Sequence, residues 1–305
     1  MWLLLAFLSA ALLGFYDVCK KKALLGNAVL PVLFLNTLFC SLLFLPFILL
    51  SAFTGTLDGS DFFVPAAGWE GHKYILLKSV IVLSSWTFGY FAMKHLPITI
   101  VGPINATRPV MVLVGAMLVF GENLNLWQWI GVLLAIVSFF LLSRSGKKEG
   151  LDFKHNRWVF FLVLAAVLGA VSGLYDKFLM APTEDGGVGL SRMLVQSWYN
   201  LYQCLFMGIT ILLLWRHARH NSAPFQWRWS IVLISVFLSI ADFVYFYALS
   251  LPHAMISIVS MVRRGSVIVS FLCGAVLFHE KNLKAKFIDM LLVLLGMLFL
   301  YFGSR

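Results

Sequence analysis

The sequence predicts an all-α integral membrane protein with ten transmembrane helices, arranged as a 5+5 inverted repeat. Hydrophobic residues make up 61% of the 305 residues and charged residues only 12%, whereas soluble domains average about 45–50% and about 25%. Ten apolar stretches are long enough to cross a bilayer, and the two halves of the chain share short motifs in the same order. This composition excludes a soluble globular domain.

The spans are predicted from runs of apolar residues. The first stretch has neither the basic segment nor the small-residue cleavage site of a signal peptide, so we count it as a span. The connections are too short to hold a soluble domain. A transmembrane helix needs about 20 mostly apolar residues, and the stretches that meet this length are 1–19, 29–52, 74–93, 97–120, 125–143, 157–181, 190–215, 229–250, 252–278 and 285–304.

The charged linker 144–156 divides the chain into two predicted five-helix units, residues 1–143 and 157–305, which resemble each other. Motifs that recur in the same order indicate a duplication. Because five spans is an odd number, the second unit must enter the membrane inverted, which is a transporter architecture with its site near the midplane. The recurring motifs are GFYD (14–17) and GLYD (173–176), YFAMKHLP (90–97) and YFYALSLP (245–252), and GAMLVFGENL (115–124) and GAVLFHEKNL (274–283).

The distribution of lysine and arginine predicts the orientation. Of 23 such residues, fifteen lie on the side of the bilayer that holds the linker, five lie on the opposite side, and three lie within spans. Because cytoplasmic loops carry the excess of basic residues, we expect the linker in the cytoplasm and both termini outside, in the inner (plasma) membrane of a bacterium. The net charge of +10 is then an orientation signal, and no segment offers the folded basic face that nucleic-acid binding needs.

One segment resembles a family signature. RPVMVLVGAMLVFGENLNLWQWIGVLLAIVSFFLL, residues 108–142, is similar to the EamA-type signature of the drug/metabolite transporter superfamily. The resemblance implies a secondary transporter of small metabolites that needs no ATP hydrolysis and no cofactor. Members of the family usually keep both termini in the cytoplasm, opposite to the orientation that the charges predict. The matching positions are Pro109, Gly121, Glu122, Leu124, Gln128, Trp129 and Gly131, with a looser second set at Phe278, Glu280, Leu283 and Gly296.

Three arginines lie where the bilayer is most apolar. Arg108 and Arg263 each follow a helix-opening proline by eleven residues, about 16 Å along a helix that rises 1.5 Å per residue. This is the middle of a hydrocarbon core about 30 Å thick. Asp242 lies at nearly the same depth, so we expect it to form an ion pair with Arg263. One acid against three arginines leaves two positive charges, which predicts an anionic small-molecule substrate held by Arg108, Arg263 and Arg264.

Other polar and aromatic residues fall on faces that would surround this centre. Helical spacing groups Trp86 with Tyr90 and Asn105 with Arg108, and Tyr245 is the repeat counterpart of Tyr90. Each aromatic side chain could instead face lipid or belong to an interfacial belt. The further candidates for substrate binding are Tyr90, Trp86, Tyr245, Asn105, Asn36 and Asn200.

Asp17 and Asp176 form a second repeat-matched pair, each within about one turn of its helix end. We expect an interfacial ion pair with a nearby lysine, Lys20 or Lys21 in the first case and Lys177 in the second. The alternative is proton coupling, because a carboxylate beside a membrane cavity can load and release protons. Asp17, Asp176 and Asp242 would then drive export of amphipathic or cationic compounds.

Other functions fit the sequence less well. The four cysteines have no CxxC spacing and the histidines have no HExxH or other ligand spacing, so we expect neither a disulfide framework nor a metal site. No catalytic constellation is recognisable, which makes an enzyme a weak alternative. A purely structural membrane protein would leave the three buried arginines unexplained. The expected partners are the lipid bilayer and a small-molecule substrate, and the sequence is compatible with a homodimer.

Overall fold

The computed structural model describes residues 2–111, 114, 125–147, 155–180, 182–218, 223–250, 262–278 and 283–303. Within these ranges the regular structure is helical and contains no strand, so the all-α prediction is confirmed there. A short 3₁₀ helix, Thr183–Asp185, lies between α7 and α8. The α-helices are α1 (Trp2–Leu24), α2 (Val29–Phe53), α3 (Trp69–His95), α4 (Ile98–Ala106), α6 (Leu126–Lys147), α7 (Arg157–Met180), α8 (Arg192–Ala218), α9 (Trp229–Ser250), α11 (Ser266–Leu277) and α12 (Leu283–Gly303).

Each predicted span contains one of these helices. Several bounds differ from the prediction: α3 begins at Trp69 rather than at 74, and α6 continues to Lys147 rather than ending at 143. Hydropathy marks where the apolar run ends, whereas backbone hydrogen bonds carry a helix on into polar residues. Four helical segments of the described residues are long and apolar enough by themselves to cross a membrane, which supports an integral membrane protein: Val29–Phe53, Trp69–His95, Arg157–Met180 and Lys286–Gly303.

Side chains cap several helix ends. Asn125 and Gln128 form a capping box at the start of α6, in which each backbone N–H donates to the other side chain, at 3.0 Å and 2.9 Å. Gln128 belongs to the family-like motif, so this part of the motif has a local structural role. After α1, Gly26 has a φ of +65°, a conformation that costs glycine no steric strain. Lys21 Nζ donates to the carbonyl oxygen of Leu96 at the end of α3, at 2.6 Å.

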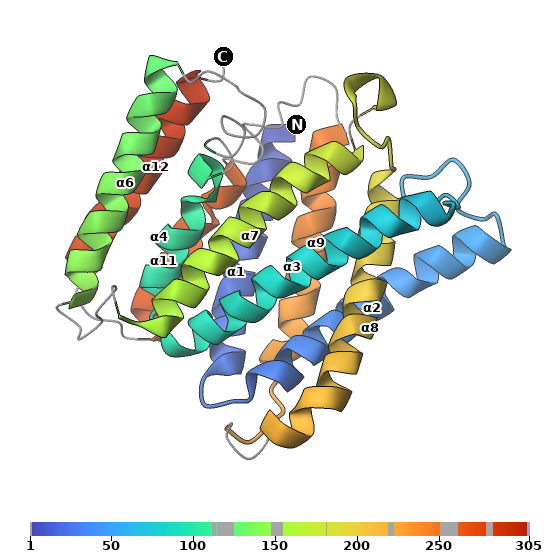
Figure 1. Ribbon diagram of the computed structural model, residues 1–305, viewed down its shortest axis with the longest axis horizontal. Helices are drawn as coiled ribbons and strands as arrows, with labels where there is room; N and C mark the ends of the chain where they lie inside the picture. Colours follow the sequence, from blue (N-terminus) through green and yellow to red (C-terminus); the bar gives the residue numbers. More distant parts are fainter. Residues whose placement is uncertain are drawn as a thin grey trace.

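The helices pack in pairs that join the two halves of the chain. α1 packs against α9, α3 against α7, α2 against α8, α4 against α11 and α6 against α12. Figure 1 shows α6 and α12 side by side at one edge of the bundle. It also shows that α1 begins and α12 ends at one end of the bundle, whereas α6 ends and α7 begins at the opposite end. This relative placement agrees with the topology derived from the charges.

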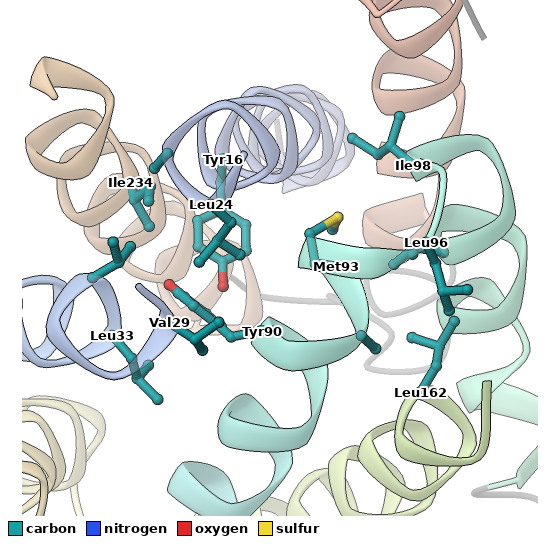
Figure 2. Packing of buried hydrophobic residues seen from close by; sticks show 14 of the residues in the cluster. Tyr16, Leu24, Val29, Leu33, Tyr90, Met93, Leu96, Ile98, Leu162 and Ile234 are labelled. Carbon is teal, nitrogen blue, oxygen red and sulfur yellow. The ribbon is translucent and has the colours of Figure 1, made fainter. Parts of the chain in front are cut away.

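Two apolar clusters close opposite ends of the bundle. The linker-side cluster joins the ends of α1 and α3 to the starts of α2, α4 and α7, and Figure 2 shows its packing. The terminus-side cluster joins the ends of α2 and α7 to the starts of α3 and α8. The linker-side cluster includes Tyr16, Leu24, Val29, Leu33, Tyr90, Met93, Leu96, Ile98, Leu162 and Ile234, and the terminus-side cluster includes Phe44, Val64, Ile75, Leu179, Met193, Leu194, Val195 and Tyr199.

The fourth predicted span is interrupted beside its arginine. α4 ends at Ala106, Thr107 forms a turn, and residues 108–111 are helical again. Thr107 N–H donates to the carbonyl oxygen of Ile104, three residues back, at 3.2 Å. Pro109 accounts for the turn, because it has no N–H and its ring displaces the carbonyl group four residues earlier.

The ninth predicted span has a matching interruption. Residues 262–264 are helical, Gly265 forms a turn, and α11 follows. Gly265 N–H donates to the carbonyl oxygen of Val262 at 2.9 Å. A single turn of this tighter kind within a helix often marks a hinge or strain. The prediction of uninterrupted helices over 97–120 and 252–278 is therefore wrong at these two points.

Glycines allow α11 to lie close to its neighbours. A Cβ built on Gly274 of α11 would lie 2.4 Å from Ile98 Cγ2 of α4, and one built on Gly14 of α1 would lie 2.4 Å from Val269 Cβ of α11. Small residues at helix crossings are typical of membrane bundles, in which close backbone approach supplies packing energy.

This packing predicts a stability difference between two repeat-related glycines. Gly14→Ala forces a methyl group against Val269, whereas the methyl group of Gly173→Ala meets no atom within 4 Å. Overpacking costs about 1–3 kcal/mol, so Gly14→Ala should lower the thermal unfolding temperature of the detergent-solubilised protein by several degrees. Gly173→Ala is the matched control and should leave it unchanged. Equal unfolding temperatures for the two variants would contradict the packing at Gly14.

Candidate functional site

Arg263 and Asp242 form the ion pair that the sequence predicted. Arg263 Nη2 donates to Asp242 Oδ1, and the two side chains are 16% and 13% exposed. Tyr199 Oη of α8 donates to Asp242 Oδ2 at 3.3 Å. The Arg263 guanidinium also lies over the ring of Tyr245, with Cζ 4.2 Å from the ring centroid. A carboxylate, a hydroxyl and an aromatic face therefore hold this arginine in place.

Arg108 is held by neutral groups. Its Nη2 donates to Asn105 Oδ1 at 3.0 Å, so the predicted placement of Asn105 on the same face is confirmed. Its guanidinium lies against the backbone of Gly169 in α7, where a Cβ would come within 2.7 Å of Arg108 Cζ and Nη1. Among the described residues no salt bridge reaches Arg108, and its Nε has no hydrogen-bond partner. No sequence pattern indicated the role of Gly169, because the contact joins residues far apart in the chain.

Arg264 is half-buried and lies in the same region. It interacts electrostatically with Arg108, Arg263, Tyr245 and Asp17. Within the described part of the chain, no hydrogen bond or salt bridge holds its guanidinium group. The three predicted arginines thus meet at the two interrupted helices, and only Arg263 has an acidic partner there.

Asp17 pairs locally, as predicted, but inside the bundle. Lys20 Nζ donates to Asp17 Oδ1 at 2.7 Å. Lys20 is only 7% exposed and lies over the rings of Tyr16 and Tyr90, 4.2 Å and 5.5 Å from their centroids. The pair is therefore enclosed by the bundle beside the linker-side cluster, and its depth in the membrane stays a prediction.

Asp176 pairs with a different lysine from the one predicted. Its Oδ1 accepts from Lys78 Nζ of α3, whereas the sequence suggested the adjacent Lys177. Lys78 is 3% exposed and lies 5.0 Å from the centroid of the Tyr199 ring. The partner comes from α3 because α3 packs against α7 along its length.

Burial also corrects the charge count that predicted the orientation. Lys20, Lys21 and Lys286 were counted on the linker side and Lys78 on the opposite side, but all four are buried, with 7%, 7%, 0% and 3% of their surface exposed. Without them the count is twelve against four. The bias keeps its direction, and the orientation remains a prediction.

Buried amides line the neighbouring helices. Asn36 and Asn200 face inward as expected, at 0% and 3% exposure. Asn36 Oδ1 accepts from Ser235 Oγ at 3.1 Å, and Asn200 Nδ2 donates to the carbonyl oxygen of Gln196 at 2.9 Å. Gln196 was missed by the sequence reasoning, although it shares a helical face with Asn200 and Gln203. Neither amide atom of Gln196 or Gln203 has a partner among the described residues.

The predicted aromatic residues divide between two places. Tyr90 is buried in the linker-side cluster, and the partly buried Trp86 packs against it. Figure 2 shows Tyr90 near Tyr16, on the side of the cluster away from Leu162. Tyr245 lies under Arg263 instead. Tyr245 therefore contacts the arginine group directly, whereas Tyr90 contacts Lys20.

A groove lies between α3 and α8, away from the arginines. It has a volume of about 290 Å³ and is lined by residues that include Ser84, Thr87 and Thr210. Each of these hydroxyls donates to a carbonyl oxygen of its own helix at 2.8 Å. The groove therefore offers no unsatisfied polar group, and its lining suits a lipid chain better than a polar substrate.

Some residues named in the sequence analysis do not belong to the arginine group or lie outside the described ranges. In the described ranges no three His, Cys, Asp or Glu side chains lie together in a way that could hold a metal ion. Glu122, Glu280 and His253 lie outside the described residues.

The pair of Lys78 and Asp176 predicts a measurable coupling. Asp176→Asn leaves Lys78 charged and unpaired inside the bundle, a change that costs about 3–5 kcal/mol in buried pairs. The variant should unfold at a clearly lower temperature than the wild type. Adding Lys78→Met should recover most of the loss, and thermal unfolding of the wild type, both single variants and the double variant measures this. Losses that simply add in the double variant would contradict the pairing.

Comparisons with known proteins agree on the kind of protein. A relative from Archaeoglobus fulgidus, named "Uncharacterized transporter", is 24% identical over 194 residues, which is 63% of this chain and 64% of the relative. The match thus spans less than two thirds of that relative. A solved structure described as "Crystal structure of protein" covers 100% of this chain and 98% of its own at a TM-score of 0.61 and 16% identity, which shows the fold alone. The model of the EamA-like transporter family matches residues 1–144, and this match agrees with the resemblance noted in the sequence.

Proposed function

We propose that this protein is a secondary transporter that moves a small anionic metabolite across the membrane by alternating access. The observation that carries the proposal is the group of three arginines at the two interrupted helices, of which only Arg263 is paired with an acid. The family match and the transporter-named relative support transport as the general function. Both point away from an enzyme.

The helix pairing supports a 5+5 inverted repeat with units 1–143 and 157–305. In such a repeat α1, α2, α3, α4 and α6 correspond to α7, α8, α9, α11 and α12. The observed pairs α2·α8, α4·α11 and α6·α12 then join equivalent helices. The pair α1·α9 is converted into the equivalent pair α7·α3 when the two units are interchanged. A pseudo-two-fold axis between the units produces this pattern. Helices interrupted at corresponding positions of two repeats are the usual place of a transporter's site.

The charges support an anionic substrate. The three arginines, Lys20 and Lys78 have three acids among them, Asp17, Asp176 and Asp242. Of the other buried charges in the described ranges, Lys21 donates to backbone carbonyl oxygens, and Lys286 and Asp289 lie on α12 with opposite charges. Two positive charges are left over. Each central charge costs at least about 2.5–3.5 kcal/mol in a bilayer, and an anionic ligand held by guanidinium groups offsets this cost.

The two apolar clusters supply the gates that alternating access requires. Residues of the loop between α2 and α3 help to close the terminus side. Phe62 stacks between Phe47 of α2 and Phe243 of α9, with centroid distances of 5.4 Å and 5.2 Å, and Asp61 Oδ1 accepts from Arg192 Nη2 at 2.6 Å. Parting of this stack would open the arginine group on that side while the linker-side cluster stays closed.

Proton-coupled export of cationic compounds is less well supported. The carboxylates that would load protons, Asp17, Asp176 and Asp242, each hold a basic partner. A cationic substrate would also have to approach a region with a positive surplus.

A ligand screen with purified protein tests the proposal. Small anions should raise the thermal unfolding temperature of the wild type, and Arg108→Ala should abolish this stabilisation because the guanidinium that contacts the ligand is gone. Cations and zwitterionic amino acids should have no such effect. Stabilisation by cations alone, unchanged in Arg108→Ala, would contradict the proposal.

A gentler pair of variants tests the same site without removing a charge. The methyl group of Gly169→Ala displaces the Arg108 guanidinium, whereas that of Gly173→Ala, one turn along α7, meets no atom within 4 Å. Gly169→Ala should weaken anion binding by about tenfold, which corresponds to 1.4 kcal/mol, and Gly173→Ala should leave it unchanged. Equal affinities in both variants would remove Arg108 from the site.

The stacked Phe62 predicts a change in accessibility. In a cysteine-free background, a cysteine at the buried position of Phe44 should react slowly with a membrane-impermeant maleimide added outside intact cells. Adding Phe62→Ala should speed the reaction severalfold, because the ring that covers the terminus side is removed. An unchanged rate would show that Phe62 does not close this side, and labelling only from the cytoplasm would reverse the proposed orientation.

A further inference from the structure

We propose that the site selects an anion that carries two negative charges on one compact group, with Arg108 and Arg264 as the two guanidinium groups that bind it. This inference rests on the proposed function and names the charge class of its substrate. A phosphate monoester and a short dicarboxylate share this chemistry.

The three acids that lie with the arginines and lysines each accept a hydrogen bond from one basic side chain. Asp176 accepts from Lys78, Asp17 from Lys20 and Asp242 from Arg263. Each of these three acids of the described ranges is therefore held by a basic neighbour in a hydrogen-bonded ion pair. The two cations without such an acid in the described ranges are Arg108 and Arg264.

Arg108 and Arg264 lie at the same end of one helix contact. A Cβ built on Gly102 of α4 would lie 2.7 Å from Val267 Cγ2 of α11, and one built on Gly274 of α11 would lie 2.4 Å from Ile98 Cγ2 of α4, so the two helices pack antiparallel. Arg108 follows the end of α4 and Arg264 precedes the start of α11, which brings these two residues near each other, and the electrostatic interaction between them agrees with this placement. Asp17 also interacts with both arginines, but its Oδ1 is occupied by Lys20. Among the described residues, Tyr245 also lies near Arg264, and its ring lies under Arg263.

Arg108 and Arg264 both keep N–H donors that are available to a ligand. Arg108 donates one hydrogen bond to the neutral Asn105 and lies over a glycine, and its Nε has no partner among the described residues. Arg264 is half-buried, and no hydrogen bond within the described ranges occupies it. Each guanidinium group carries five N–H donors in a planar fork that fits carboxylate or phosphate oxygens.

The charge balance then favours a dianion over a monoanion. A ligand with one negative charge leaves one positive charge uncompensated near the membrane centre, which is costly. A ligand with two negative charges compensates both guanidinium groups at once.

Matched anions that differ in charge test the inference. Binding of methyl phosphate and methyl sulfate, which have similar shapes, is measured to the full-length protein at pH 7.5, with malonate and acetate as a second matched pair. The wild type should bind methyl phosphate at least about thirtyfold more tightly than methyl sulfate. Because the second phosphate pKa is about 6, the preference should shrink at pH 5. If the site selects for two negative charges, malonate should bind more tightly than acetate. A preference that is seen only for methyl phosphate would restrict the substrate class to phosphate monoesters.

Variants of Arg264 assign the preference to the proposed pair. Arg264→Gln should reduce the ratio of methyl phosphate to methyl sulfate binding to about threefold or less, while single-charge binding persists through Arg108. Arg264→Lys keeps the charge and should restore much of the ratio. Gly173→Ala is the control that should behave as the wild type, and thermal unfolding checks that each variant is folded.

The failures of the two proposals look different. Equal, arginine-dependent binding of methyl phosphate and methyl sulfate would overturn the dianion inference and leave the anion transporter in place. A dianion preference that Arg264→Gln does not change would remove Arg264 from the site and overturn the inference. Absence of all anion binding, or binding that ignores Arg108→Gln, would overturn both.

Discussion

A guanidinium or ammonium group inside a bilayer is stable only where an acid, a dipole or a ligand compensates its charge. This constraint organises the interior of the protein. Lys20, Lys78 and Arg263 each hold an acid, and the charged group of each also lies over the face of a tyrosine ring. The pair of Lys78 and Asp176 joins the two halves of the chain, whereas the other two pairs each lie within one half. In the proposed function, the charges that no acid compensates, those of Arg108 and Arg264, are the ones that bind a ligand.

The architecture places this part where a transporter needs it. The arginines lie at the interruptions of two helices, and the two apolar clusters lie toward opposite ends of the bundle. Glycines let α11 approach both α1 and α4, so that the interrupted elements are neighbours. Hydroxyl and amide groups on α2, α8 and α9 continue the polar surface away from the arginines, as the hydrogen bond from Ser235 to Asn36 shows. Opening of either cluster would expose the same set of groups to one side of the membrane.

The sequence was sufficient for what depends on composition and counting along one helix. Apolar runs predicted the ten helices, and counting in both directions from Pro252 predicted the common depth of Asp242 and Arg263, whose ion pair is present. Contacts between helices that are far apart in the chain could not be predicted from the sequence. Asp176 was assigned to Lys177 because neighbours in sequence were the only candidates in view, whereas helix packing supplies Lys78 from α3. Hydropathy likewise cannot tell which face of a helix points inward, so Lys20 and Lys78 were placed at the surface. Pro109 and Gly265 were visible signals for the interruptions and could have been used.

The most direct test of this account is to locate a bound anion. Crystals grown with selenate, a doubly charged anion whose selenium gives an anomalous signal, would show its position without any assumption about the natural substrate. The account predicts a single strong anomalous peak inside the bundle, in contact with the guanidinium groups of Arg108 and Arg264 and absent from crystals of Arg108→Gln. A peak confined to the protein surface, or an interior peak that persists in Arg108→Gln, would contradict it.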